Sequence, residues 1–413
     1  MTFHGISLRT LSHIGIGMII ILNSRANSLQ NADISFSTDF ESGSATNLHV
    51  QPDGVVAFSI SPDPGGNEYL WFNFKVIGAG DRRPEFLIEN ALGAHQTGER
   101  WNITRPVFSS DGIHWTRAAD VSYAREFSLK NPLGAMRYRF WAPFASDTIQ
   151  VAYCYPYPLS ILESFLDSLR GNPKCTVGKI GFSEDGRQIP QLLIAASADG
   201  GANKERIWII CREHSGETPA SYVCEGFIKA LLEHPAGRRL LDQFDFSIVP
   251  MLNVDGVTRG YYYRNAKGVN LARDWESFAS AEVKSLRSAL EADAERGRLR
   301  LVVNLHSSND PTKGHFFLKM IESTLKSDDA RLQDDFFEAA DGNHPQLQGK
   351  QRVRVHDIPG ITSNAIYRRY GVYTLYLESN YSRGADGSEV TPESRRGVGL
   401  ALVQAVAEGF VPE

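Results

Sequence analysis

The chain has 413 residues, of which 42% are hydrophobic, so it is long enough to bury a large core and to form two or three domains. Its 43 basic and 48 acidic residues nearly balance. Binding to nucleic acid or to an anionic membrane surface depends on clustered positive charge. The composition therefore excludes a nucleic-acid partner and indicates a globular protein.

An apolar run, Ile14–Leu22, lies near the start of the chain and follows Arg9. It is shorter than the roughly 20 residues that a membrane-spanning helix needs. Small residues at Ser24 and Ala26 resemble a signal-peptide cleavage site. The sequence thus predicts a signal peptide over residues 1–26, export to the periplasm or medium, and no stable membrane insertion after cleavage. An uncleaved anchor and a buried N-terminal strand are the alternatives.

Residues 33–153 alternate short β-rich runs with clusters of turn-forming residues. Strands are expected at Tyr69–Val76, Pro84–Ile88 and Met136–Trp141, with a turn at Ser110–Gly112 between them. Long helical patterns do not interrupt these runs. The segment is typical of a β-sandwich domain.

Prolines at 156 and 158 mark a domain boundary, and the residues after it, 159–413, have a different pattern. A helix is expected from Leu159 to Leu169, followed by a hairpin over 179–195 that turns at Ser183–Gly186. Strands then alternate with amphipathic helices, which indicates an α/β domain. The main helix candidates are Ala220–Leu232, Ser280–Glu295 and Thr391–Glu408.

The segment Glu322–Lys350 is rich in charge and contains Asp328-Asp329 and Asp334-Asp335. Runs of charge usually form exposed faces. The sequence therefore predicts a solvated insertion here, which interrupts the alternation of strands and helices.

The chain has four cysteines, at positions 154, 175, 211 and 224. They are too few and too irregularly spaced for a disulfide scaffold or a thiolate metal site. We expect them in the core, although an exported chain could form one bridge, such as Cys154 to Cys175.

A histidine and a glutamate three residues apart, His214 and Glu217, follow the apolar run Ile207–Cys211. Thr218 and Pro219 come next and are typical of a helix start. The pair is therefore predicted in a strand-to-helix loop, the kind of loop where ligands collect in α/β sheets. Two further apolar runs are followed directly by His306 and by Glu378.

Two imidazoles and one carboxylate form a ligand set that leaves zinc an open coordination position, as hydrolytic sites require. His214, Glu217 and His306 would make such a set. Each residue alone could equally be a hydrogen-bonded structural group at a strand end. The conjunction of all three with a nearby acid, Glu378, favours a metal site.

From about residue 33 onward the chain resembles the zinc metallocarboxypeptidases, and specifically the branch called cytosolic carboxypeptidases. The resemblance implies an antiparallel β-sandwich at 33–153, then a catalytic domain at 159–413 with an α/β/α fold and a mixed central sheet. It also implies one Zn²⁺ per chain and a peptide substrate. The motifs that carry it are Asp39–Gly43, Ala152–Ser160, Arg212–Glu217 and Pro250–Val257.

The same resemblance implies roles for individual residues. Arg264 would polarise the scissile carbonyl, Arg273 would bind the terminal carboxylate of the substrate, and Glu378 would act as general base. Guanidinium suits both arginine roles because it stays charged and presents a planar fork of donors. The metal ligands would be His214, Glu217 and His306.

The chain departs from the family pattern at the substrate-binding segment. Asn270 stands where the family has aspartate, and Ala272 replaces the asparagine that helps to bind the terminal carboxylate. Ser363 occupies the position of a basic residue in members that remove acidic residues, so a preference for glutamate is not predicted. In the family a tyrosine closes over the substrate. Here its position could be that of Tyr367, which has the side chain, or that of His356, which lies nearer the expected spacing.

The sequence as a whole predicts a zinc carboxypeptidase that hydrolyses the last peptide bond of a peptide. Because of Ala272, a zinc amidohydrolase acting on cell-wall peptides or amide-linked small molecules is the first alternative. A non-catalytic binding module on the same fold is the second. The oligomeric state cannot be predicted from the sequence.

Overall fold

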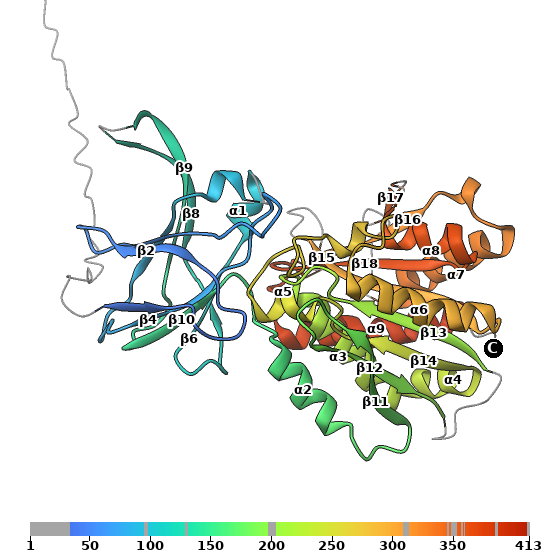
Figure 1. Ribbon diagram of the computed structural model, residues 1–413. Helices are drawn as coiled ribbons and strands as arrows, with labels where there is room; N and C mark the ends of the chain where they lie inside the picture. The colour runs from blue at the N-terminus through green and yellow to red at the C-terminus, as the bar shows by residue number, and fades with distance from the viewer. Residues whose placement is uncertain are drawn as a thin grey trace, which may run out of the picture.

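The computed structural model describes residues 34–94, 98–128, 131–196, 204–308, 314–344, 347, 353–356, 358, 360–384 and 387–410. They form a β-sandwich and an α/β domain that lie side by side (Figure 1). The predicted signal peptide at 1–26 lies outside the described residues. Within the described ranges, none of the helices has the length and apolar character needed to cross a membrane.

The first domain consists of two five-stranded sheets, which confirms the predicted β-sandwich. The strand orders are β1-β4-β10-β6-β7 and β2-β3-β5-β9-β8. Strand pairs are antiparallel except for β3 with β5. The strands are β1 Ser35–Ser37, β2 Thr46–Val50, β3 Val56–Ser59, β4 Asn73–Ile77, β5 Glu85–Ile88, β6 Val107–Ser109, β7 Thr116–Arg117, β8 Val121–Ser128, β9 Asn131–Trp141 and β10 Thr148–Ala152.

Aromatic rings fill the space between the two sheets. The ring of Phe58 lies 5.1 Å from that of Phe72 and 4.8 Å from that of Phe74, distances that favour edge and tilted packing. The strand expected from Tyr69 begins only at Asn73. The residues before it leave the ladder because the chain there returns from a loop, 63–68, that contacts the second domain.

The second domain is built on an eight-stranded mixed sheet of order β11-β12-β14-β13-β15-β18-β16-β17, as the resemblance implied. Its centre, β14-β13-β15-β18, is parallel. The predicted hairpin is present as β11 and β12, with Gly186 at a positive φ of 80° in the turn. The strands are β11 Cys175–Phe182, β12 Gln188–Ile194, β13 Glu205–Cys211, β14 Phe244–Val249, β15 Leu299–Ser308, β16 His315–Met320, β17 Val353–His356 and β18 Thr374–Asn380.

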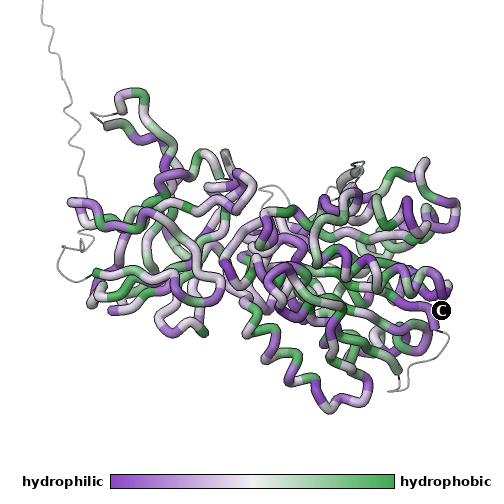
Figure 2. Tube along the Cα trace, viewed as in Figure 1, coloured by the Kyte–Doolittle hydropathy of each residue, from purple (hydrophilic) through white to green (hydrophobic). Residues whose placement is uncertain are grey.

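The three main predicted helices are present as α3, α6 and α9, and two of them have side-chain N-caps. Ser280 Oγ accepts from Val283 N, and Thr391 Oγ1 accepts from Ser394 N. Hydrophobic and polar residues alternate along the turns of α2 (Figure 2). The helices are α1 Glu99–Ile103, α2 Leu159–Ser168, α3 Thr218–Glu233, α4 Pro235–Gln243, α5 Val254–Thr258, α6 Ala281–Glu295, α7 Ser327–Asn343, α8 Thr362–Tyr370 and α9 Pro392–Phe410, with short 3₁₀ turns η1 Ala91–Gly93, η2 Leu271–Arg273 and η3 Glu322–Thr324.

The prediction of a solvated insertion at Glu322–Lys350 is wrong. Most of this segment is α7, which packs against α9 and belongs to the fold. Leu332, Phe336 and Ala340 are buried at a spacing of four residues, which places them on one face of a helix. The paired aspartates lie on the rest of the helix surface. Because they dominate the sequence of this segment, its apolar stripe is hard to recognise there.

All four cysteines are free thiols, so the bridge that an exported chain could form between Cys154 and Cys175 is not present. Cys154, Cys211 and Cys224 are buried, as expected for core residues. Cys175 is only partly buried at the start of β11.

Candidate active site

The predicted metal-binding residues lie at the carboxyl ends of neighbouring parallel strands. His214 and Glu217 are in the loop that connects β13 to α3, and His306 is near the end of β15. Because β13 and β15 are paired in parallel, their ends meet at the same edge of the sheet. The fold therefore brings together residues that are about ninety positions apart in sequence.

His214, Glu217 and His306 form a compact cluster that could hold a metal ion. Their ligand atoms lie within 4.8 Å of one another. Nδ1 of His214 is 2.7 Å from Oε1 of Glu217, and Nδ1 of His306 is 2.9 Å from Oε2 of the same carboxylate. All three side chains are buried. Burial opposes ionisation of Glu217, but the adjacent imidazoles outweigh it and hold its pKa below the usual value.

The outer nitrogen of each histidine has its own acceptor. Nε2 of His214 is 3.2 Å from Oδ1 of Asn270, and Nε2 of His306 is 2.8 Å from Oε2 of Glu213. A proton on each Nε2 leaves the Nδ1 lone pair directed at the centre of the cluster. This is the tautomer that a metal-binding histidine needs.

Glu213 is a site residue that the sequence analysis missed. It is fully buried, and besides His306 its carboxylate accepts hydrogen bonds from Asn304 Nδ2 at 2.8 Å and Thr362 Oγ1 at 2.6 Å. Burial opposes its ionisation, but His306 and the two neutral donors lower the pKa of Glu213. Its position next to His214 in the sequence was visible, but nothing in the spacing distinguished it from a surface glutamate.

The loop that carries His214 is held in a constrained shape by Arg212. This residue is buried with a positive φ of 60°, an unusual conformation for a residue other than glycine. Its guanidinium donates to the carbonyl of Ser215 and to Oγ of Ser221. Gly216 has no room for a side chain, since a Cβ there would meet Tyr262 Cδ2 at 2.7 Å. The metal-binding loop is thus fixed before any ligand binds.

Glu378 lies beside the cluster on the next strand. In the parallel pair of β15 and β18 it is in register with His306, so the two side chains point to the same face of the sheet. The ring of Tyr376, also on β18, stacks on that of His306 at 4.6 Å. Glu378 is only partly buried, in contrast to the three residues of the cluster.

A pocket of 540 Å³ contains both predicted arginines, the catalytic Arg264 and the substrate-binding Arg273. Arg264 and Arg273 both line it, and Asn270 connects it to the metal cluster through His214. Tyr263 also lines it and stacks on the His214 ring at 3.7 Å. A substrate in this pocket would therefore meet two guanidinium groups close to the cluster, one of them paired with Glu68.

The β-sandwich reaches into this pocket through its loop 63–68, which the sequence analysis did not predict. Glu68 pairs with Arg264 through two hydrogen bonds, both 2.9 Å. Asp63 accepts from the backbone N–H groups of residues 262, 263 and 264 at 2.5 to 2.9 Å. A Cβ at Gly66 would overlap the Arg264 guanidinium and the Glu68 carboxylate, so a larger residue there would force this ion pair to move.

Three residues at which the sequence raised questions have clear positions. Asn270 contacts His214, whereas Ala272 is buried, with 3% exposure, and offers no side-chain donor. The hydroxyl of Tyr367 contacts Lys326 N and Asp329, so it is tied to the start of α7 and does not lie in the pocket. The side chain of His356 lies outside the described residues.

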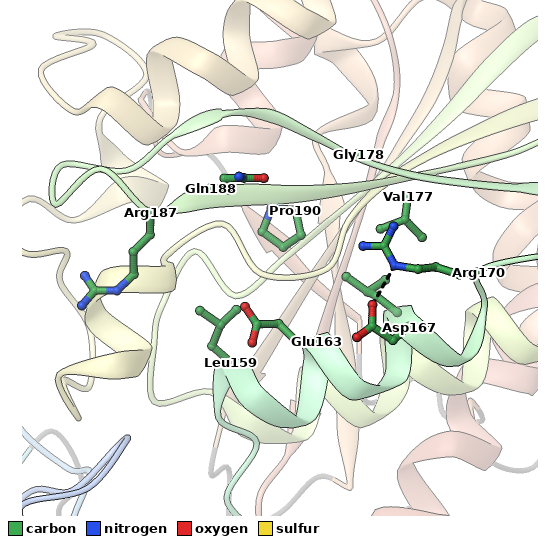
Figure 3. A pocket seen from close by; sticks show the side chains of 10 residues that line it. Leu159, Glu163, Asp167, Arg170, Val177, Gly178, Arg187, Gln188 and Pro190 are labelled. Atoms are coloured by element: carbon green, nitrogen blue, oxygen red, sulfur yellow. Dashed lines mark hydrogen bonds and ion pairs between the residues drawn. The ribbon is translucent and has the colours of Figure 1, made fainter.

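A second cavity, of 580 Å³, lies between α2 and the β11–β12 hairpin (Figure 3). Its lining shares no residue with the metal cluster. Arg170 in this cavity is paired with Asp167, and Arg187 is paired with Asp255. The two predicted arginines line the other pocket, and Asn270 in that lining contacts His214 of the predicted metal ligands.

Two family models match this chain, one over each of its two domains. The zinc carboxypeptidase family model matches residues 162–371, which is half of the chain, and the model of the cytosolic carboxypeptidase N-terminal domain matches residues 36–153. Mouse cytosolic carboxypeptidase 6 is 31% identical over 268 residues, which cover 62% of this chain. The alignment covers only 49% of the mouse protein, so the chain spans about half the length of this relative.

Other similarities extend over nearly the whole chain. An uncharacterized protein of Zymomonas mobilis is 27% identical over 383 residues, covering 88% of this chain and 93% of that protein. The crystal structure of a metallo-carboxypeptidase from Burkholderia cenocepacia has the same fold, with a TM-score of 0.80, 23% identity, and coverage of 91% of this chain and 99% of that chain. With the family models, these findings lead to one conclusion: this chain belongs to the zinc carboxypeptidase family.

Proposed function

We propose that this protein is a zinc-dependent carboxypeptidase that hydrolyses the C-terminal peptide bond of a peptide. The observation that carries the proposal is the joint placement of a buried His214–Glu217–His306 cluster, an acid on the adjacent strand, and a pocket with two arginines. A set of metal-binding residues alone would support many hydrolytic reactions. The arginines add a site for a substrate that carries a carboxylate.

The residues of the cluster fit zinc by their chemistry. Two imidazole nitrogens and a carboxylate are ligands that Zn²⁺ prefers, and three protein ligands leave a position for water or substrate. Both histidines have their Nε2 positions satisfied by other acceptors, so Nδ1 remains for the metal. When bound, zinc would lower the pKa of a water molecule and polarise the substrate carbonyl.

The other residues have distinct tasks in this mechanism. Glu378 would take a proton from the attacking water and return it to the leaving amine, which general acid–base catalysis by a positioned carboxylate allows. Arg264 would donate to the carbonyl oxygen as negative charge develops on it. Arg273, exposed in the same pocket, would bind the terminal carboxylate of the substrate.

The proposal is tested with the purified full chain in two measurements. The first is metal content after dialysis against metal-free buffer, where we expect one zinc per chain. The second is hydrolysis of matched peptides with a free or an amidated C-terminus, where we expect cleavage of the free form only. A chain without zinc would be a binding module, and equal cleavage of both peptides would make it an amidohydrolase. Either result would contradict the proposal.

We also propose that the mature protein is exported, on the basis of the apolar segment Ile14–Leu22. The mammalian relatives are named as cytosolic proteins, which argues against this proposal. N-terminal sequencing of the protein expressed with its full sequence would decide between the two. A mature chain that starts at Asn27 would support export, and one that retains residues 1–26 in the cytoplasm would refute it.

A further inference from the structure

The two histidines of the cluster have unequal partners. Nε2 of His214 faces a neutral amide oxygen, that of Asn270 at 3.2 Å, whereas Nε2 of His306 faces the carboxylate of Glu213 at 2.8 Å. A carboxylate behind a metal-binding histidine fixes the ring and makes it a stronger ligand, while an amide only fixes the ring. The structure therefore supplies this kind of support to His306 and not to His214.

Glu213 is also unfavourably placed for an ionised carboxylate, because it is fully buried. Its exposure is 0%, and an ionised carboxylate in such a position is strongly destabilising unless charge and hydrogen bonds compensate it. The neutral donors Asn304 and Thr362 supply hydrogen bonds but no charge. A bound dication would be balanced by the two carboxylates of Glu213 and Glu217, which together carry the opposite charge. Asn270 contributes no charge.

We propose that Glu213 is a positioning residue for the metal, acting through His306, and that it supplies the supporting carboxylate that Asn270 does not supply to His214. The inference rests on the proposed function because it assumes a divalent ion in the cluster. The inference assigns different tasks to Glu213 and Asn270, which both contact a predicted metal-binding histidine. Glu213 sets how tightly the metal binds, and Asn270 sets the orientation of His214.

The test measures the zinc dissociation constant of the full chain by competition with a chromogenic chelator, so it does not depend on turnover. Glu213→Gln keeps the shape and the hydrogen bond but removes the charge. We expect it to weaken zinc binding about 10- to 100-fold, the usual loss when a supporting carboxylate is removed. Asn270→Asp alone should tighten binding, by roughly tenfold, because His214 then gains a carboxylate.

The decisive variant exchanges the two groups. Glu213→Gln combined with Asn270→Asp keeps the number of carboxylates and moves one from His306 to His214. We expect its zinc affinity to return to within about threefold of the wild-type value, since the charge around the cluster is restored. Wild-type affinity in Glu213→Gln, or an exchange variant that binds no better than Glu213→Gln, would overturn the proposal. If Glu213→Gln fails to fold, unchanged affinity in Asn270→Asp would do the same.

Asp293→Asn is the matched control. Asp293 is a carboxylate of the same domain with 2% exposure, and it accepts from Arg206 and Trp208 without contacting the cluster. Its loss should lower the unfolding midpoint and leave zinc affinity unchanged. An equal loss of zinc affinity in this control would show a general effect of destabilisation and refute the assignment. A wild-type chain that binds no zinc would refute the proposed function as well, which distinguishes the two failures.

Discussion

The two ends of the active site are built in different ways. At the metal end, His214, Glu217 and His306 belong to one domain, lie at the ends of paired strands and are almost completely buried. At the arginine end, Arg264 and Arg273 lie in the loop and 3₁₀ turn after α5, which Figure 1 shows where the α/β domain meets the sandwich. Arg264 is about one fifth exposed and is held by Glu68 from the other domain.

This difference separates the demands of metal binding from those of substrate positioning. A metal site needs ligand positions accurate to a few tenths of an ångström, which strand ends provide because their backbones are fixed by the sheet. The arginine pocket combines the recognition proposed for Arg273 with the catalytic role proposed for Arg264, and its place between the domains lets the sandwich act on it without moving the metal ligands. On this view the sandwich is part of the active site, since Asp63 and Glu68 hold the loop that carries Arg264.

The largest effect is expected at the metal end, from Glu378→Gln. The substitution keeps the size of the side chain but removes the proton acceptor, so kcat should fall by about 10²- to 10⁴-fold. Zinc content should remain at the wild-type value because Glu378 is not one of the clustered ligands. Steady-state kinetics and metal analysis on the same preparation provide both values. A variant that keeps full turnover would remove Glu378 from its assigned role.

Arg264→Ala should have the next largest effect. Loss of a donor to the developing oxyanion typically costs about 10²- to 10³-fold in kcat, with a much smaller change in KM. The measurement is the separation of kcat from KM with one free-carboxylate peptide. A change confined to KM would show instead that Arg264 binds the ground state, and the roles of the two arginines would have to be reconsidered.

Glu68→Gln tests whether the sandwich acts on catalysis through Arg264. A partly exposed ion pair is worth up to about 1 kcal/mol, so we expect kcat to fall by roughly fivefold. In the Arg264→Ala background the same substitution should have no further effect if Glu68 acts through Arg264, because the ion pair between them has been removed.

Glu85→Gln is the control for this cycle, since Glu85 pairs with Arg139 inside the sandwich with similar exposure. It should leave kcat unchanged in both backgrounds. Effects of Glu68→Gln and Arg264→Ala that simply multiply would mean that Glu68 acts on the reaction independently of Arg264.

The same contrast explains how much could be predicted from the sequence. His306 and Glu378 were found because each directly follows an apolar run, and His214 because it lies three residues before Glu217 soon after another such run. Parallel strands bring such positions together. Glu68 could not be found because its partner is 196 residues away in another domain and no local pattern records that contact. The error at α7 had a different origin: the spacing of Leu332, Phe336 and Ala340 was a valid helical signal, but the charges around it were given more weight.

The smallest effect is expected from Ala272→Asn, which adds a donor at the arginine end. If a free terminal carboxylate binds Arg273, the new amide should lower KM for such peptides by about threefold, within the 0.5 to 1.5 kcal/mol of an ordinary hydrogen bond. The gain is limited because Ala272 is 3% exposed and the larger side chain must displace its neighbours. Amidated peptides, measured as competitive inhibitors, serve as the control, since they lack the second carboxylate oxygen and should bind no more tightly to the variant. An unchanged KM in a variant with the wild-type unfolding midpoint would mean that the terminal carboxylate binds elsewhere, and that the arginine end recognises another part of the substrate.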